Sequence, residues 1–216
     1  MATPKLGYFN AAGKRIPGTT TIISRFKESG GLIRWAWQCG MDGIDYEAER
    51  NAAADAGTMA HEMVECWILD RPYVPPADID AVTVDKASAA FGAFLTWARQ
   101  SNLKVTHTEV RLVSERHQFG GTLDAMLVNG QLCLGDWKSS NSVHRDYLIQ
   151  LAAYGLLWRE NHPDKPIDGG YHLVRFSKTD GDFEHRYFPA LDDAERSFLL
   201  MRELYELDKK LKKRIG

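Results

Sequence analysis

The chain has 216 residues, of which 44% are hydrophobic and 26% are charged, and its formal net charge is −2. These values are close to those of an average soluble globular protein, so we expect a sizeable core. No apolar run reaches the roughly 18 residues of a transmembrane helix, and the N-terminus lacks the basic and apolar stretches of a secretory signal. We therefore expect a cytoplasmic protein that is neither secreted nor embedded in a membrane.

Cysteine content and net charge restrict the classes of cofactor and partner. The three cysteines, Cys39, Cys66 and Cys133, are far apart and form no C-x-x-C pair. This spacing argues against a zinc ribbon and against an iron–sulfur cluster, and a sparse, odd set is typical of a reducing cytosol. A net charge near zero neither requires nor excludes nucleic acid, because a groove can be basic while the remaining surface is acidic.

The amino-terminal half is predicted to be mainly helical. Residues 17–27, which begin with Pro-Gly and are rich in β-branched side chains, could be a short strand or the entry to a helix. The second helix is predicted from its Ala- and Glu-rich composition, with a break near Gly57, and the prolines at 72, 75 and 76 predict a loop. Apolar residues at helical spacing mark the third helix. The expected helices cover 31–38, 45–69 and 78–101.

The sequence changes character at Leu103, where β-branched residues become frequent. The elements expected from there are a strand over 103–115, a hairpin over 120–138, a helix over 144–160, a second hairpin over 170–188 and a helix over 192–213. This order predicts an α/β fold with a mixed central sheet flanked by helices. We expect one domain over 1–216, comprising a helical part (1–101), a sheet core (102–190) and a carboxyl-terminal helix (191–216).

Three charged residues interrupt the apolar strands of the first hairpin. Asp124 lies in the first strand, and Asp136 and Lys138 end the second. Taken singly, each could cap a bulge, begin a turn or face solvent, as most Asp and Lys residues do. Together, among so many apolar neighbours, they imply buried carboxylates, which are strongly disfavoured without a counter-charge. A divalent cation such as Mg²⁺ binds carboxylate oxygens, and Lys138, two residues after Asp136, shares its strand face.

The turn at Asn129-Gly130 decides whether these charges meet. A two-residue turn pairs 128 with 131, which puts Asp124 and Asp136 on opposite faces. A type I turn with Gly130 in a bulge pairs 127 with 131 and 122 with 136, which puts Asp124, Asp136 and Lys138 on one face. Metal chemistry therefore predicts the bulged turn or an equivalent shift by one residue.

An Asp followed across a hairpin by D-x-K resembles the PD-(D/E)XK nuclease superfamily. Within it the chain is similar to the RecB-like branch, which includes phage-type and mitochondrial genome-maintenance exonucleases. The matching segments, which span roughly 16–188, are G-T-T-T-I-I-S at 18–24, G-T-M-A-H at 57–61, G-T-L-D at 121–124, D-W-K-S-S at 136–140, and the Q-x-x-x-Y pair Gln150 and Tyr154. The chain departs from the pattern because Leu123 replaces the proline, the second acid is Asp, and the cysteine cluster of some relatives is missing.

The resemblance implies a restriction-endonuclease-like fold and metal-dependent hydrolysis of phosphodiester bonds. Asp124, Asp136, His61 and the carbonyl of Trp137 would hold one or two Mg²⁺ or Mn²⁺ ions, with no iron–sulfur cluster. Imidazole tolerates Mn²⁺ better than Mg²⁺, so we expect Mn²⁺ to support activity well. Lys138 would orient or deprotonate a water, or stabilise the transition state.

Further residues have supporting roles in this interpretation. Glu109 could support a metal-bound water or form an ion pair with Arg111. Gln150 and Tyr154 share a helix face, and could contact the DNA backbone, support the metal-site strands or be a plain polar stripe. His61 could also be structural. The other candidates for DNA binding are Thr20, Ser24 and Arg25.

The resemblance implies DNA as the substrate. The sequence contains no recognisable sequence-specific DNA reader, and backbone and stacking contacts suit single strands or duplex ends of any sequence. Arg34, Trp35 and Trp37 combine basic and aromatic side chains, although tryptophans often pack in a core. The lysine-rich segment 209–214 could be a solvated helix end, which the helix dipole favours, or a DNA-binding tail. We expect the solvated helix end.

Two other functions stay open: a restriction-type endonuclease, and a non-catalytic nucleic-acid-binding protein with a nuclease fold. The resemblance places an exonuclease in recombination, repair or phage DNA metabolism, with a recombination or replication protein as a further partner.

Overall fold

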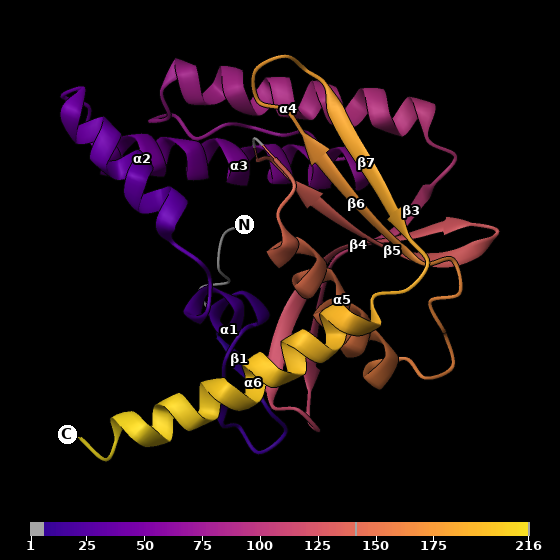
Figure 1. Ribbon diagram of the computed structural model, residues 1–216. Coiled ribbons are helices and arrows are strands. Elements are labelled where there is room, and N and C mark those ends of the chain that lie inside the picture. The colour runs from indigo at the N-terminus through magenta and orange to yellow at the C-terminus, as the bar shows by residue number, and fades with distance from the viewer. Residues whose placement is uncertain (1–6, 141, 216) are drawn as a thin grey trace.

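The computed structural model describes residues 7–140 and 142–215 (Figure 1). Residues 1–6, part of the segment in which we found no secretory signal, lie outside the described residues. Within the two described ranges, no helix is both long enough and apolar enough to cross a membrane.

A five-stranded sheet in the order β3-β4-β5-β6-β7 forms the centre of the fold (Figure 1). Neighbouring strands are antiparallel except β5 and β6, which are parallel and are connected through α5. A parallel pair needs such a crossover, because the chain must return to the same end of the sheet. The strands are β3 (Lys104–Ser114), β4 (Phe119–Asn129), β5 (Gln131–Lys138), β6 (Tyr171–Phe176) and β7 (Phe183–Phe188).

Helices cover both faces of this sheet (Figure 1). On one face, α1 (Thr19–Arg25), α5 (Arg145–Asn161) and α6 (Asp192–Lys212) surround a core that includes Phe119, Leu151 and Phe198. On the other face, α3 (Tyr46–Ile68) and α4 (Ala81–Gln100) pack with Trp97 and Trp137 in a second core. The predicted α/β fold with a mixed sheet flanked by helices and a helical amino-terminal half is confirmed.

The second predicted helix is continuous, so the expected break at Gly57 was wrong. α3 begins after Asp45, whose side chain accepts hydrogen bonds from the N–H groups of Glu47 and Ala48, and it continues through Gly57. A Cβ at Gly57 would lie 2.8 Å from Oγ of Ser139, just beyond the end of β5. Gly57 therefore allows the helix to approach the sheet closely and does not end it.

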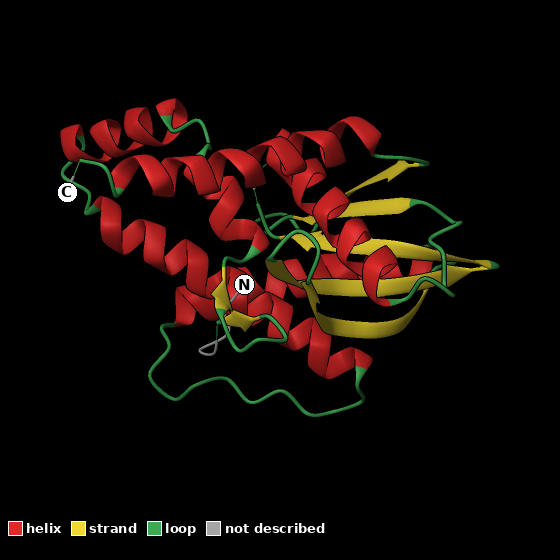
Figure 2. Cartoon of the chain, turned by 90° about the horizontal axis from the view of Figure 1, so that it is seen from below, coloured by secondary structure: helices red, strands yellow, loops and turns green. Residues whose placement is uncertain are grey.

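The segment before α3 was only partly predicted. Residues 17–27 are mostly helical, since α1 covers Thr19–Arg25, and α2 covers Gly30–Met41. Two short strands that we did not expect, β1 (Tyr8–Phe9) and β2 (Arg15–Ile16), form a small sheet beside the main one (Figure 2). The N–H of Gly120 donates to the carbonyl of Pro17 at 3.0 Å, which connects this segment to β4.

The hairpin register puts the three charged residues on one face, by a turn that we did not specify. Asn129 pairs with Gln131 and Ala125 pairs with Gly135, so Gly130 stands alone at the tip. Its φ of +74° favours glycine. The proposed pairing of 127 with 131 was wrong, because Leu127 pairs with Cys133. The actual register is shifted by one residue from that of a two-residue turn. A shift by one residue was the alternative to the bulged turn that metal chemistry predicted.

Candidate active site

The two strands of the hairpin separate where the carboxylates lie. Backbone pairing of β4 with β5 runs from the turn as far as Ala125 and Gly135, after which β4 continues beside β3 and β5 beside β6. Asp124 and Asp136 are the next residues on each strand. The backbone N–H of Trp137, no longer paired with β4, donates to Oδ2 of Asp124 at 2.8 Å. Since the N–H and C=O of a strand residue point to the same edge, the Trp137 carbonyl is directed toward β4.

Both carboxylates are buried with too few partners. Asp124 and Asp136 each have 0% exposure, and within the described residues neither Oδ1 atom has a hydrogen-bond partner. The ammonium of Lys138 lies 2.5 Å from Oδ2 of Asp136 and over the ring of Tyr147 on α5. Two carboxylates thus share one lysine. Buried charges are normally paired and fully hydrogen-bonded, so this arrangement lacks positive charge.

His61 and Glu109 complete a group that could hold a cation. One ligand atom each from His61, Glu109 and Asp124 lies within 4.8 Å of the others. His61 comes from α3, one turn after Gly57, and Glu109 from β3, where its φ of +51° departs from the strand conformation. Glu109 faces these groups, whereas Arg111 donates to the carbonyl of Gly7 and lies over the ring of Tyr8. The oxygen and imidazole ligands fit Mg²⁺ or Mn²⁺.

The pKa values follow from burial and from the crowding of like charges. Removal from water, followed by the charge of Asp124, raises the pKa of Glu109 to about 8. Burial, offset in part by Lys138, raises the pKa of Asp136 to about 7, and burial likewise raises the pKa of Asp124. Burial lowers the pKa of His61 to about 3, so its imidazole is neutral, the form that binds metals. Burial alone would lower the pKa of Lys138, but the two carboxylates more than offset this and raise it.

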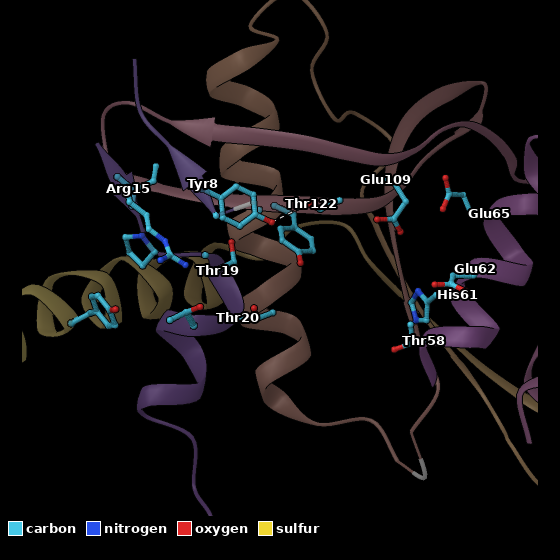
Figure 3. Close-up of a pocket in the computed structure, with 18 of the residues that line it drawn as sticks. Tyr8, Arg15, Thr19, Thr20, Thr58, His61, Glu62, Glu65, Glu109 and Thr122 are labelled. Atoms are coloured by element: carbon cyan, nitrogen blue, oxygen red, sulfur yellow. Dashed lines mark hydrogen bonds between the residues drawn. The ribbon is translucent and has the colours of Figure 1, made fainter. Parts of the chain in front are cut away.

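A cavity of about 610 Å³ opens beside this group (Figure 3). Figure 3 shows His61, Glu62, Glu65 and Glu109 at one end, and Tyr8, Arg15, Thr19 and Thr122 at the other. Lys209 and Tyr205 of α6 also line it. One end is therefore acidic, and the remaining wall combines two cations with hydroxyl groups, a composition that suits an anionic ligand near a cation site.

Gln150 and Tyr154 lie on one face of α5 as predicted, and both are buried. Nε2 of Gln150 donates to the hydroxyl of Tyr154 at 2.7 Å, and Tyr154 lines the cavity. A Cβ at Gly121 would lie within 2.9 Å of Tyr154, Leu157 and Thr19. The glycine of the G-T-L-D segment thus lets α5 and α1 pack closely against β4. This geometry favours support of the strands over direct contact with DNA for Gln150.

Of the three residues predicted only as DNA-binding candidates, one lines the cavity and two do not. Thr20 lines the cavity. Ser24 is exposed and donates to the carbonyl of Thr21, and Arg25 forms an ion pair with Asp208 of α6 at 2.5 Å; neither is among the residues that line the cavity. Trp35 and Trp37 are 40% and 61% exposed, so the alternative that these tryptophans pack in a core is wrong.

Sequence reasoning missed much of the cavity wall. Glu65 follows His61 by four residues, one helical turn, and could have been noticed for that reason, whereas Glu62 is simply the next residue. Thr58 stood inside the G-T-M-A-H segment without being singled out. Lys209 belongs to the lysine-rich run that we interpreted as a solvated helix end, yet it lines the cavity. Nothing in the pattern marked Arg15, because it meets the site only through tertiary packing.

Comparison with known proteins gives remote structural likenesses. No protein-family profile matches the chain, and no curated protein matches its sequence. A candidate exonuclease from Eubacterium rectale superposes with a TM-score of 0.46 at 13% identity, covering 69% of this chain and 64%, just under two thirds, of that one. An alkaline exonuclease from Laribacter hongkongensis gives a TM-score of 0.36 at 14% identity, covering 76% of this chain and 92% of that one.

Proposed function

We propose that the chain is a divalent-metal-dependent deoxyribonuclease that hydrolyses phosphodiester bonds, acting as an exonuclease at DNA ends or on single strands. The observation that carries this proposal is the pair of fully buried carboxylates, Asp124 and Asp136, which share Lys138 beside His61 and Glu109. A site with this deficit of positive charge is suited to a cation. The proposed setting is recombination, repair or phage DNA metabolism, in the cytoplasm and with a recombination or replication protein as partner.

Each residue of the site has a proposed role. Asp124, Asp136, His61 and the Trp137 carbonyl would hold one or two Mg²⁺ or Mn²⁺ ions, and Glu109 belongs to the same group. When bound, such an ion lowers the pKa of a water and neutralises charge on the phosphate. Lys138 orients the attacking water and offsets the negative charge that develops on the phosphate oxygens. Gln150 holds Tyr154, which supports the strand carrying Asp124.

The cavity accounts for the choice of a nucleic acid as substrate. Its acidic end would hold the cation, and Arg15 and Lys209 along the wall would bind neighbouring phosphates of the strand. Tyr8 and Thr122, joined by a hydrogen bond of 3.0 Å between their hydroxyls, add polar contacts that depend on no base. Contacts of this kind suit hydrolysis without sequence specificity.

The exposed tryptophans of α2 support single-stranded DNA as one substrate. Trp37 is 61% exposed, and Arg34 beside it is also exposed. Bases stack on such rings with little sequence preference. Trp37→Ala should weaken binding of oligothymidylate several-fold, measured by fluorescence anisotropy in EDTA. Equal affinity of the variant and the parent protein would remove α2 from the proposal.

Nuclease assays on labelled DNA test the reaction itself. The parent protein should release nucleotides in Mg²⁺ or Mn²⁺ and none in EDTA, and Lys138→Ala should abolish turnover while the protein keeps its fold by circular dichroism. Lys86→Ala on α4 is a matched control that should leave turnover unchanged. If Lys138→Ala cleaves normally, the assignment of the site is wrong.

Circular single-stranded DNA and metal dependence separate the two rival functions. An exonuclease leaves the circle intact, whereas cleavage of the circle would favour the restriction-type endonuclease. DNA binding with no metal-dependent release of nucleotides, from circles or from linear DNA, would favour the non-catalytic binding protein. A series labelled at the 5′ or the 3′ end then gives the polarity of digestion.

A further inference from the structure

One face of α6 is apolar and has no partner within the described chain. Leu200, Leu204, Leu207 and Leu211 are 58%, 48%, 45% and 59% exposed. Their spacing of four, three and four residues is that of the seam of a coiled coil. Contiguous exposed apolar surface of this kind is uncommon in a monomer and marks an interaction site.

The opposite face of α6 already holds the helix on the protein. Phe198 is fully buried against Phe119, and the guanidinium of Arg202 donates to the carbonyls of His117 and Gln118. At the edge of the leucine face, Arg25 of α1 binds Asp208 in an ion pair. The leucine face is therefore the side that points away from the core. The carboxyl-terminal half of α6 extends beyond the sheet (Figure 1), where a second helix can reach the leucine face.

The charges beside the leucines identify the partner as a second copy of the same helix. Glu203 and Lys210 are both exposed and lie on the same edge of the leucine face. An antiparallel pair that sets Leu204 opposite Leu207 of the partner subunit also sets Glu203 opposite Lys210 of the partner subunit. By symmetry this contact occurs twice, so the face is complementary to itself.

The distribution of charge along the helix favours the same direction. The first turn of α6 is acidic, with Asp192, Asp193 and Glu195, and its last turn is basic, with Lys209, Lys210 and Lys212. An antiparallel pair brings each acidic end toward the basic end of the other helix. A parallel pair would place Glu203 near Asp208 of the partner subunit, and like charges there oppose pairing.

We propose that the chain forms a two-fold dimer through an antiparallel pair of α6 helices whose seam is Leu200, Leu204, Leu207 and Leu211. Tyr205 and Lys209 line the cavity from another side of the same helix, so the dimer leaves both active sites open. The inference rests on the surface of α6 and does not depend on the proposed nuclease function.

Sedimentation velocity of the full chain over a wide range of concentrations tests the proposal. The parent protein should sediment as a species of twice the chain mass in reversible equilibrium with the monomer. Leu204→Glu/Leu207→Glu should raise the dissociation constant at least about 100-fold, because four charges would enter the seam. Leu32→Glu/Ile33→Glu, at two residues of α2 that are 49% and 64% exposed, is a matched control that should leave the dimer intact.

Charge reversal tests the direction of the helices. Glu203→Lys alone and Lys210→Glu alone should each raise the dissociation constant about five- to tenfold, because each places like charges in two symmetric contacts. The combined variant Glu203→Lys/Lys210→Glu should restore the affinity of the parent protein. A monomer at all concentrations, a trimer, a dimer insensitive to Leu204→Glu/Leu207→Glu, or a combined variant weaker than either single variant would each overturn the proposal. Thermal unfolding of every variant confirms that it remains folded.

Discussion

Replacing Asp124 by asparagine should stabilise the metal-free protein while removing its response to metal. In the parent protein two fully buried carboxylates share the single ammonium of Lys138. Asp124→Asn removes one negative charge and leaves the ion pair of Asp136 with Lys138 intact. The carbonyl of the new amide can still accept the N–H of Trp137, which donates to Oδ2 of Asp124 at 2.8 Å.

The expected magnitude follows from these contacts. A buried charge with no partner destabilises a protein by several kcal/mol. Relaxation of the surroundings and partial pairing with Lys138 reduce this cost. We therefore expect Asp124→Asn to raise the free energy of unfolding by about 1–3 kcal/mol. For a protein of this length, 1 kcal/mol corresponds to about 2–4 °C, so the melting temperature should rise by about 2–12 °C. Mn²⁺ at roughly 100 times its dissociation constant should stabilise the parent protein by about 2.7 kcal/mol and the variant by much less.

Differential scanning calorimetry in EDTA and in Mn²⁺, at constant ionic strength, measures both effects. Asp78→Asn, at an exposed aspartate in the loop before α4, is the matched control and should change neither value. A metal-free Asp124→Asn protein that melts below the parent would show that the carboxylate is stabilising without a cation. An undiminished response to Mn²⁺ would show that Asp124 is not a ligand. Either result would refute the reasoning.

Three further predictions test the packing around the site and the edge of the sheet. Gly121→Ala should lower the free energy of unfolding, measured by chemical denaturation, by about 1–3 kcal/mol, because the added Cβ would meet three side chains. The control Gly92→Ala adds a Cβ in open space on α4 and should raise the free energy of unfolding by about 0.5–1 kcal/mol. Tyr154→Phe leaves the buried amide of Gln150 without its acceptor and should cost about 1–3 kcal/mol, and adding Gln150→Leu should recover most of this loss if the hydrogen bond is the cause. Burial lowers the pKa of His172 to about 4, so the unfolded state binds more protons between pH 6.5 and 4, and roughly 2 kcal/mol of stability present above pH 6.5 should be lost as the pH falls toward 4. His172→Gln should flatten this part of the pH profile; an unchanged slope would assign it to other groups.

The path of the chain from Leu103 onward was largely predictable because local patterns specify it. Two apolar runs around the Asn129-Gly130 turn predicted the hairpin formed by β4 and β5, and the amphipathic pattern predicted α5. The register was harder, because Asn-Gly is compatible with more than one turn. The requirement that Asp124 and Asp136 share a face selected the parity of the pairing, but the single-residue tip at Gly130 came from the structure.

Glycines show where local reasoning fails. Gly57 was interpreted as a helix breaker, as its low intrinsic propensity predicts, yet α3 continues through it. The reason is a tertiary contact: Ser139 lies where a side chain at position 57 would be. A one-residue pattern cannot distinguish a glycine that ends a helix from one that allows close packing.

By itself, the sequence determined the order of the main elements, the mixed sheet flanked by helices, and the identity of the charged residues that must lie inside it. These follow from local periodicity and from the cost of burying a charge without a partner. Only the tertiary structure decided that β4 and β5 separate beside Asp124 and Asp136, that His61 and Glu109 meet Asp124 there, and that Arg15 and Lys209 line the same cavity. Such contacts join residues far apart in the chain, and their geometry depends on how whole helices and strands pack, which no short stretch of sequence encodes.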